Sequence, residues 1–442
     1  MHLPKIAILG GHYLKNLCLP EGVWSCNLPL SIDSGADNSV QKLLRDQCPF
    51  QPDLLLFADQ GCLPMLTGFD DLEVPCAAYL IDTHLHYCWH RHFAGMFDQV
   101  FAAQRNAAAS LEPHALSCRW LPLFSRHGNL REQLPKEHDI VFVGTVDSRR
   151  NPERVGFLDA FARVMPLAVR SGDYRRPYNT ARIILNQSVR NDLNFRVFEA
   201  LASGGFLLTD DVGNGLELLF EPGRHLVTYA KGDVADATEK ARYYLKHPEE
   251  RECIAATGHA RVVAEHTLAI RSQQLVALLT AHADTACPHP QRRGLKKLAA
   301  GRSYLAIALL MADLEKLVGS GSYGQRVGWY RWLAGEALEH HSTMETAGEE
   351  IMPDLALLAH LRGEAARAAA YARIALLNDP CNPELLLLAA RISASRGDAA
   401  AASRLYATAV QVINDLRGRS SDQLLLEHLL EALQFCRRQL SS

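Results

Sequence analysis

The residues best suited to hold a charged ligand lie in the stretch from Arg182 to Tyr229. A strand-like run, ARIILNQS, leads into a polar loop, and a helical segment that begins near Asn194 carries Arg196 and Glu199 about one turn apart. Open α/β sheets bind ligands at the carboxyl ends of their strands, and a helix N-terminus with arginines beside it attracts phosphate. A carboxylate one turn further along can accept both hydroxyls of a ribose. This stretch therefore predicts a site for a diphosphate and a sugar diol.

Neighbouring polar residues extend the same predicted site. Arg190 precedes the helix, and the next strand-like run, GGFLLTDD, delivers Asp211 into a glycine-bearing loop. Arg190 and Arg196 together predict a local positive charge. The alternative for Arg196 and Glu199 is a salt bridge on a helix surface, because charged pairs at this spacing are common there.

A second group of candidates could move a proton. Asp82 and His84 directly follow the strand-like run CAAYLI, so we expect them at its carboxyl end, facing the cleft. Histidine can take a proton from an acceptor hydroxyl near neutral pH, and a neighbouring carboxylate can orient it or act itself. His12, just after Gly10 and Gly11, is another candidate for the base or for contact with a donor.

The histidines of the first half do not predict a metal site. They are His84, His86, His90, His92 and His114. Members of an HLH or HRH pair share one face of a strand but lie about 200° apart on a helix. Because this segment follows a strand as loop or helix, we expect these histidines on a helix surface and no bound metal.

The elements that must position these residues form two similar units, residues 1–136 and 137–285. Apolar runs of strand length recur in both: KIAILGG, DLLLFAD, CAAYLID, QVFAA and RWLPLF in the first, and DIVFVGT, PLAVRSG, ARIILNQS, GGFLLTDD and HLVTYA in the second. Continuous apolar runs of this length are typical of buried parallel strands joined by crossovers. The long helical stretch that closes the second unit should break at Pro248. We predict two Rossmann-like α/β domains in tandem.

A helical region is predicted at 296–442, after a linker with the sequence CPHPQRRG. Gly363 and Gly397 are 34 residues apart, as are Ala375 and Ala409, and Pro380 follows Ala375 by five residues. This period is that of the tetratricopeptide repeat (TPR), whose stacked helix pairs usually contact proteins. A less regular helical pair, GSYGQRVGWYRWLAGEALEHH, precedes the two repeats.

The composition narrows the class of protein. Of 442 residues, 48% are hydrophobic and 21% charged, which rules out wholesale disorder. The net charge of −3 lacks the basic excess of a dedicated nucleic-acid binder. No apolar run approaches the roughly 20 residues of a membrane span, and the absence of a leader-like N-terminus predicts a cytoplasmic protein. The eleven cysteines form no CxxC pair, which predicts reduced, structural thiols.

The stretch from Arg182 onward resembles the C-terminal half of GT-B glycosyltransferases, and specifically the CgeB-like group with its LN-R-FEALA-GG-LLTD run. Further short matches follow in the same order over residues 75 to 275. They are FDQVFAAQ, RWLPLF, HDIVFVGT, FEPGRHLVTY and RYYLKHPEERECIAATGHARVVAEHT. The resemblance implies two domains facing a cleft, with a nucleotide-sugar held mainly by the second and no metal needed at the diphosphate.

The resemblance also implies roles for single residues. Glu199 matches the glutamate that holds the donor ribose, and Arg190 and Arg196 stand where positive charge faces the diphosphate. Related retaining enzymes carry a second glutamate eight positions earlier. Asn191 stands there in this chain, which favours inversion of the sugar carbon.

Further positions follow from the same resemblance. Gly144 and Thr145 match the turn on the nucleotide side, and Asp82 lies where CgeB-like proteins carry an aspartate. Gly10 and Gly11 resemble the loop that faces the donor, with a simple tight turn as the alternative. The full set expected to bind the nucleotide-sugar is Gly10, Gly11, Gly144, Thr145, Arg190, Asn194, Arg196, Glu199 and Asp211.

Together these observations predict a metal-independent transferase with a nucleotide-sugar donor, UDP-linked, and no other cofactor. The arrangement resembles bacterial enzymes that glycosylate flagellin, which implies that the TPR-like region presents serine or threonine of a protein. Alternatives are a non-catalytic scaffold with a degenerate transferase domain, or a transferase acting on a saccharide. A Rossmann oxidoreductase is disfavoured because no strand end carries GxGxxG.

Overall fold

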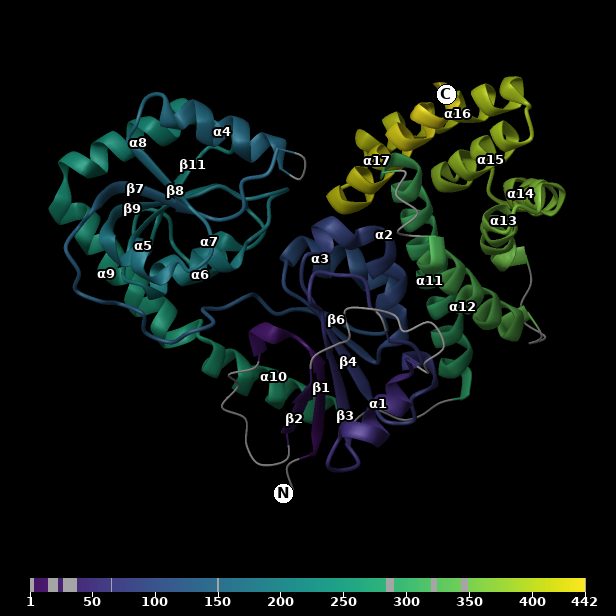
Figure 1. Cartoon of the computed structure of the whole chain (residues 1–442), viewed down its shortest axis with the longest axis horizontal. Coiled ribbons are helices and arrows are strands. Elements are labelled where there is room, and N and C mark those ends of the chain that lie inside the picture. The colour runs from purple at the N-terminus through teal and green to yellow at the C-terminus, as the bar shows by residue number, and fades with distance from the viewer. Residues whose placement is uncertain are drawn as a thin grey trace.

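The computed structural model describes residues 4–14, 23–26, 38–64, 66–148, 151–283, 290–318, 324–342 and 349–441. Within these ranges the chain forms two α/β domains, each built on one parallel sheet, and a C-terminal helical region (Figure 1). This division agrees with the predicted succession of two α/β units and a helical part. The predicted boundary at residue 285 lies outside the described residues.

The first domain holds six parallel strands in the order β2-β1-β3-β4-β5-β6. They are β1 (Ile6–Gly10), β2 (Val23–Cys26), β3 (Leu54–Ala58), β4 (Cys76–Leu80), β5 (Gln99–Ala102) and β6 (Cys118–Trp120). The helices are α1 (Val40–Gln47), α2 (Thr83–Phe93) and α3 (Arg105–Leu111), with 3₁₀ turns η1 (His12–Leu14), η2 (Phe69–Asp71), η3 (Ala94–Met96) and η4 (Glu112–His114). The five predicted strands are present, although the run RWLPLF contributes only its first two residues to β6. Strand β2 was not predicted.

The second domain holds five parallel strands in the order β11-β10-β9-β7-β8. They are β7 (His138–Val143), β8 (Leu167–Arg170), β9 (Ala181–Asn186), β10 (Phe206–Asp210) and β11 (Val227–Tyr229). Its helices are α4 (Pro152–Ala162), α5 (Arg175–Thr180), α6 (Phe195–Ala202), α7 (Leu216–Leu219), α8 (Val234–Lys246) and α9 (Pro248–Glu265). The predicted break at Pro248 is confirmed, because this proline starts α9.

Each sheet has one point where the strand order reverses. In the first sheet the reversal lies between β1 and β3, and in the second it lies between β7 and β9. The loops that leave the carboxyl ends of two such strands diverge and open a crevice, which is where open α/β sheets bind ligands. These two crevices are therefore the places to look for a site.

The chain crosses between the α/β domains twice, and the two crossings lie side by side. The backbone N–H of Ser125 donates to the carbonyl of His266 at 2.8 Å, and the N–H of Leu268 donates to the carbonyl of Ser125 at 2.9 Å. After this crossing, α10 (Leu268–Ala283) packs on the first domain, where Leu275 and Leu279 join its apolar core.

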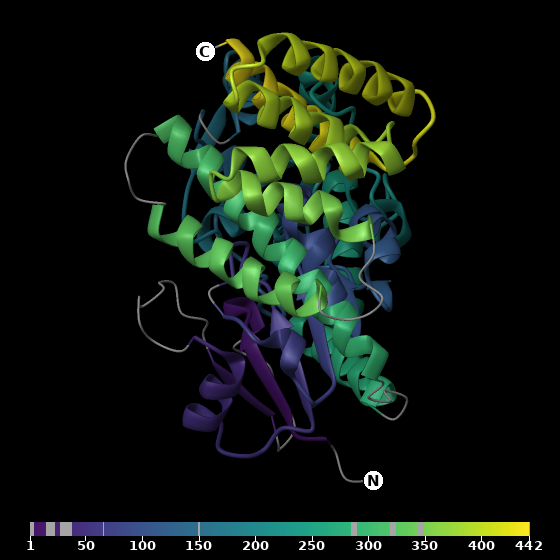
Figure 2. The ribbon, with the colours of Figure 1, turned by 90° about the vertical axis from the view of Figure 1, so that its right-hand side faces the viewer.

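The helical region consists of α11 (Pro290–Val318), α12 (Gly324–Ser342), η5 (Glu349–Ile351), α13 (Met352–Leu361), α14 (Ala365–Asn378), α15 (Pro383–Ser395), α16 (Ala399–Arg417) and α17 (Gln423–Ser441). Figure 2 shows these helices stacked one above another. Gly363 and Gly397 occupy equivalent turns, with φ of 78° and 79°, between the helices of two successive hairpins. Ala375 and Ala409 are buried at matching positions, so the 34-residue period is a repeat of the structure.

The predicted linker CPHPQRRG is partly wrong, since α11 already begins at Pro290. Proline suits the first turn of a helix because the N–H it lacks would have no partner there. Residues Cys287 to His289 of this stretch lie outside the described ranges. The remainder is the first turn of a helix that packs against the first domain.

One apolar cluster joins the first domain to the helical region. It contains Phe57 and Trp89 of the first domain together with Leu305, Ile307 and further residues of α11, α12 and α13. Lys296 of α11 also pairs with the buried Asp98 at 2.9 Å. The helical region is therefore packed onto the first sheet as part of one folded body.

Two findings bear on the class of protein. Among the described helices, none combines the length and the low polarity that a membrane span needs. The nine cysteines within the described ranges are free thiols, and Cys18 and Cys287 lie outside them.

Candidate functional site

Two arginines, the buried Arg154 and the half-buried Arg196, occupy the crevice of the second sheet. Arg196, in the first turn of α6, donates from Nε to Asn186 Oδ1 at 2.8 Å. Arg154, in the first turn of α4, donates from Nε to the Gln187 carbonyl at 3.2 Å. Their guanidiniums lie 5.5 and 5.7 Å from the ring centroid of Phe142, near the end of β7. Burial and the nearby Arg196 lower the pKa of Arg154 to about 9. The crevice thus concentrates positive charge that an anion would stabilise.

The turn after β7 is shaped by this pair. A Cβ on Gly144 would lie 2.6 Å from Arg196 Nη1 and 3.1 Å from Phe142, so a side chain here would displace the arginine. Thr145 is exposed, and its carbonyl accepts from Arg154 Nη1 at 3.2 Å. Both residues therefore lie beside the arginine pair.

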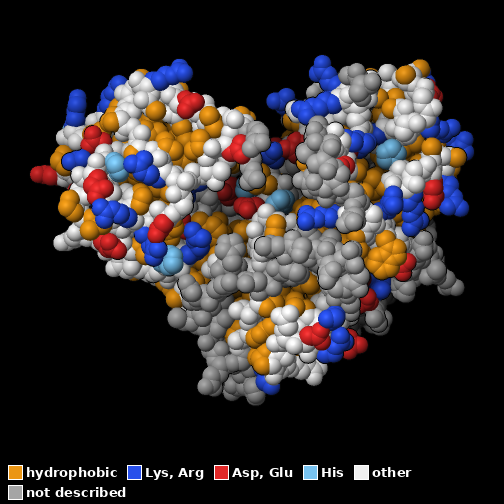
Figure 3. Space-filling view, in the orientation of Figure 1, with side chains coloured by type: hydrophobic (Ala, Val, Ile, Leu, Met, Phe, Trp, Pro, Cys, Tyr) orange, Lys and Arg blue, Asp and Glu red, His pale blue; other side chains and the backbone are white. Residues whose placement is uncertain are grey.

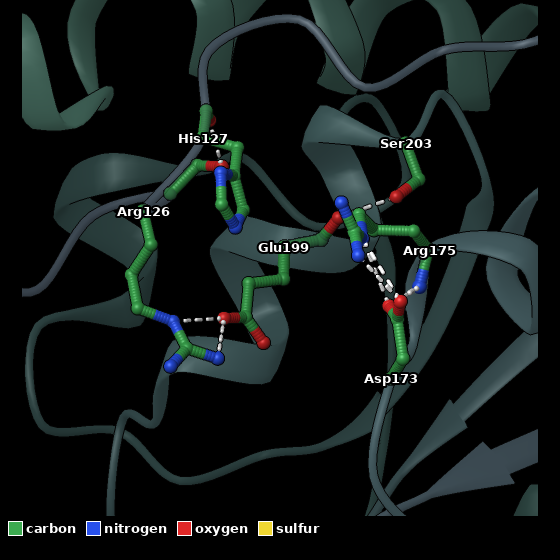
Figure 4. A network of polar contacts seen from close by, with 7 residues as sticks. Arg126, His127, Asp173, Arg175, Glu199 and Ser203 are labelled. Atoms are coloured by element: carbon green, nitrogen blue, oxygen red, sulfur yellow. Dashed lines mark hydrogen bonds and ion pairs between the residues drawn. The ribbon is translucent and has the colours of Figure 1, made fainter. Parts of the chain in front are cut away.

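Glu199 is buried and paired across the domain crossing. Its carboxylate Oε1 accepts from Nε and Nη2 of Arg126, at 2.7 and 2.6 Å, and only 2% of the residue is exposed. Figure 4 shows Arg126 reaching Glu199 from the segment that follows β6, with His127 beside the pair. The alternative of a surface salt bridge between Glu199 and Arg196 is therefore wrong, because each residue has a different partner.

Arg190 connects three parts of the molecule. Its Nη1 donates to the carbonyl of His84 at 3.1 Å, and its Nη2 pairs with Glu431 of α17. Arg190 and Asn191 have φ of 48° and 60°, a left-handed conformation that asparagine adopts more readily than most residues. Arg190 is thus engaged by the first domain and the helical region, unlike Arg196.

The two other expected donor contacts lie at the edges of the crevice. Asn194 is the residue before α6, and its Nδ2 donates to Ser188 Oγ at 3.2 Å. Its buried Oδ1 has no hydrogen-bond partner within the described residues. Asp211 is exposed and accepts from the N–H of Gly213 at 3.1 Å. Asp210, one residue earlier, is fully buried and accepts from the Ser188 N–H at 3.0 Å.

Asp82 and His84 face Asp192 of the second domain. One potential ligand atom from each of the three side chains lies within 4.8 Å of the other two. Burial raises the pKa of Asp82 to about 6 and that of Asp192 to about 7, and Asp192 adds to the shift of Asp82. Burial lowers the pKa of His84 to about 4. Asp82 and His84 follow the carboxyl end of β4, which agrees with the expected position along the chain.

The expectation that the histidines of α2 lie on a helix surface is wrong for His84 and His90. His84 is 5% exposed and His90 is fully buried, with Nδ1 of His90 3.0 Å from the Thr83 hydroxyl. Helix α2 packs against α11 and α17, and His90 faces Asp59 of its own domain, with Nε2 3.5 Å from Asp59 Oδ2. Local sequence carries no sign of this packing, because α11 and α17 come from the far end of the chain.

Gly10 and Gly11 form a tight turn after β1. Both have positive φ, and a Cβ on Gly11 would lie 2.6 Å from Cβ of Ala58 at the end of β3. This packing supports the alternative of a turn that brings two strand ends together. His12 starts η1, and its side chain lies outside the described part of the structure.

Sequence reasoning missed the residue that joins the two domains beside this site. Gln104, 2% exposed at the end of β5, donates to Asp192 Oδ1 at 2.6 Å. Its Oε1 accepts from the Leu193 N–H at 2.9 Å and from Asn214 Nδ2 at 2.7 Å. A signal was present, since Gln104 directly follows the run QVFAA. Arg154 had no comparable signal.

The surface is hollowed between the second α/β domain and the helical region (Figure 3). Acidic and histidine side chains gather on the floor of this hollow. The arrangement can therefore bind an anion at Arg154 and Arg196 of the second domain. It can exchange a proton at Asp82 of the first domain.

Residues 128–277 match the family model described as glycosyl transferase-like. The second α/β domain is a glycosyl transferase-like domain. The match begins in the segment after β6 and ends within α10, so it includes the arginine pair, Glu199 and the second of the two domain crossings, at His266 to Leu268. A search of curated proteins found no match to the chain.

Three solved structures illustrate what this chain is similar to in fold. A glycosyltransferase from Rickettsia africae is 9% identical, over 64% of this chain and 100% of that one, with a TM-score of 0.47. Anabaena HepE in complex with UDP is 11% identical, over 63% and 100%, with a TM-score of 0.49. A sucrose-phosphate synthase from Thermosynechococcus elongatus is 13% identical, over 56% and 77%, with a TM-score of 0.45. Similarities of this size carry no argument about the chemistry of this chain.

Proposed function

We propose that the protein is a GT-B glycosyltransferase that moves a sugar from a nucleoside-diphosphate sugar to a hydroxyl group. The observation that carries the proposal is the pair of the buried Arg154 and the half-buried Arg196, placed at the strand reversal of the glycosyl transferase-like domain. Negative charge grows on the diphosphate as the sugar leaves. Guanidiniums that are already held in place stabilise that charge without rearranging during the reaction.

The donor would lie along the second domain. The diphosphate would rest on Arg196 and Arg154 beside the N-terminus of α6, and the nucleoside would extend toward Glu199. The carboxylate of Glu199 is already fixed by Arg126, so it is oriented before a ribose arrives. The resemblance of the sequence makes UDP the first nucleotide to test.

The proton of the acceptor hydroxyl would pass to the first domain. Asp82, with a pKa of about 6, is mostly ionised at pH 7 and still basic enough to accept a proton. His84, with a pKa of about 4, is neutral at that pH but a weaker base. We therefore assign proton removal to Asp82, with His84 beside it.

The acceptor we propose is a serine or threonine hydroxyl of a protein. Helical hairpins that repeat every 34 residues are suited to hold a polypeptide. Their last helix, α17, reaches the rim of the site, where Glu431 pairs with Arg190. The resemblance to flagellin-modifying enzymes makes a flagellin the first acceptor to test. A saccharide acceptor would show as transfer that does not depend on any protein.

The test is a screen for hydrolysis of nucleotide-sugars by the wild type and Glu199→Ala. Loss of hydrogen bonds between the donor and a charged group should reduce kcat/KM about tenfold to a hundredfold. Glu239→Ala, an exposed glutamate on α8, is the matched control and should be unchanged. Equal turnover by the wild type and Glu199→Ala would contradict the assignment of the nucleotide site.

A further inference from the structure

Asp82, His84 and Asp192 form a compact set of ligands at the junction of the two α/β domains. Their potential ligand atoms all lie within 4.8 Å of one another. Ligand atoms on one ion at about 2.1 Å stand about 3 to 4 Å apart, so a shift of about an ångström would let all three bind it. Two of them come from the β4–α2 turn and the third from the β9–α6 loop, so the set is complete only when the domains meet.

Asp82 holds an unusual position for an aspartate. It is the residue before α2, where aspartate ordinarily accepts a hydrogen bond from the first turn of the helix. Here φ is 48° and the side chain makes no such bond. A Cβ on Gly61 would lie 2.6 Å from Asp82 Oδ2, which shows how closely the turn after β3 fits the carboxylate. The carboxylate is thus directed away from the helix that it precedes.

A second observation points to a ligand. His84 is 95% buried, and its Nδ1 has no hydrogen-bond partner within the described part of the chain. A buried polar nitrogen without a partner is costly, and a ring nitrogen of this residue lies near both carboxylates. Asp192 is held from the other side, because Gln104 donates to its Oδ1 at 2.6 Å. Partners of this kind orient the ligands of metal sites.

We propose that Asp82, His84 and Asp192 bind a divalent cation of the manganese or zinc class between the two domains. Two carboxylates and one imidazole form a mixed oxygen and nitrogen set, which suits these ions better than magnesium. The cation neutralises two carboxylates that face each other in a buried place, and it gives His84 a partner. This site departs from the expectation of no metal, which considered only histidine pairs within the first domain.

The proposed cation site uses other ligands than the diphosphate site, although the charges of Arg196 and Arg154 act on Asp192. A bound cation would hold the acceptor hydroxyl and lower its pKa. Without a cation, Asp82 remains the base proposed above. Failure of the cation proposal therefore leaves the proposed transferase intact, and failure of nucleotide binding leaves the cation proposal intact.

The experiment is a titration of the full-length, metal-free protein with Mn²⁺, without nucleotide, in which free Mn²⁺ is followed by electron paramagnetic resonance. We expect one saturable site in the wild type. Asp192→Asn and His84→Gln, which keep the size of the side chain, should each weaken binding at least about tenfold. Asp139→Asn is the matched control, because this exposed carboxylate pairs with Arg182 at the opposite end of the second sheet.

Circular dichroism of each variant verifies that it is folded, and the two substitutions lie in different domains, so one folding failure leaves the other as the test. The absence of saturable Mn²⁺ binding to the wild type, together with no displacement of Mn²⁺ by added Zn²⁺, would overturn the proposal. Equal binding by the wild type and both variants would overturn it as well.

Discussion

The two α/β domains differ in how their sheets are covered and in the charges that they bring to the site. The second domain covers its sheet with its own helices, and Phe142, Phe157 and Ala241 belong to an apolar cluster formed entirely within it. The first domain shares a cluster with the helical region. The second domain contributes the arginines Arg154 and Arg196, and the first contributes an aspartate and histidines. The C-terminal helices therefore support the side of the site that the first domain contributes.

The largest effect should follow from deletion of residues 290–442. The deletion would expose the face of the first domain that contacts Tyr304, Leu305 and Ile307, and it would leave Asp98 without Lys296. We expect loss of cooperative unfolding in the first domain and loss of donor hydrolysis together with transfer. Solubility and near-ultraviolet circular dichroism measure the outcome. A soluble deletion variant that still hydrolyses donor would make the helical region a separate module.

A large effect is expected from Arg154→Ala, and a smaller one from Arg190→Ala. Arg154 stands in the crevice of the second sheet, whereas Arg190 is engaged by the His84 carbonyl and Glu431. We expect kcat/KM for donor hydrolysis to fall about tenfold to a hundredfold for Arg154→Ala. Arg182→Ala, at the opposite end of β9, is the control. A greater loss in Arg190→Ala than in Arg154→Ala would reverse the assignment of the diphosphate site.

A moderate effect is expected where the two domains meet. Gln104→Ala would leave Asp192, the Leu193 N–H and Asn214 without their shared partner. Loss of buried hydrogen bonds of this kind costs about 1–3 kcal/mol. We expect a lower Tm and a larger radius of gyration in small-angle X-ray scattering, as the domains separate. An unchanged radius would mean that the apolar contacts alone hold them.

The smallest effect concerns how far the Tm falls at acid pH in the wild type and in His90→Phe. Burial lowers the pKa of His90 well below its usual value, so the folded state excludes a proton that the unfolded state binds. Stability from this source is complete above about pH 6.5 and is lost as the pH falls below it. His90→Phe should therefore lose less Tm than the wild type between pH 7 and pH 5.

Tryptophan fluorescence reports on the part of the molecule that holds His90, because every tryptophan lies outside residues 137–285. The signal comes from the first domain and the helical region. The second domain, followed by hydrogen exchange, should keep its protection to lower pH. A Tm difference between pH 7 and pH 5 equal in the wild type and His90→Phe would contradict the assignment.

The sequence predicted what depends on local pattern. Ten of the eleven strands were predicted, as were the break at Pro248 and the 34-residue repeat, because apolar runs, proline and glycine act over a few residues. Strand β2 was missed because VWSC is a four-residue edge strand with little apolar signal.

The candidate site was less predictable, because much of it depends on contacts between distant segments. Arg154 lies 42 positions before Arg196 and follows no motif, yet both lie beside Phe142. Asp192 meets Asp82 only across the domain junction. Helix α2 packs against α11 and α17, which begin more than 200 residues later. Patterns within one segment cannot report such contacts.

The most direct test of the central claim is calorimetric titration of the wild type and Arg196→Ala with a panel of nucleoside diphosphates. The account predicts saturable binding of at least one of them, UDP first, with one site per chain. Arg196→Ala should weaken that binding at least about tenfold, while Arg182→Ala leaves it unchanged. No binding of any nucleoside diphosphate by the folded wild type, or equal binding by Arg196→Ala, would contradict the account.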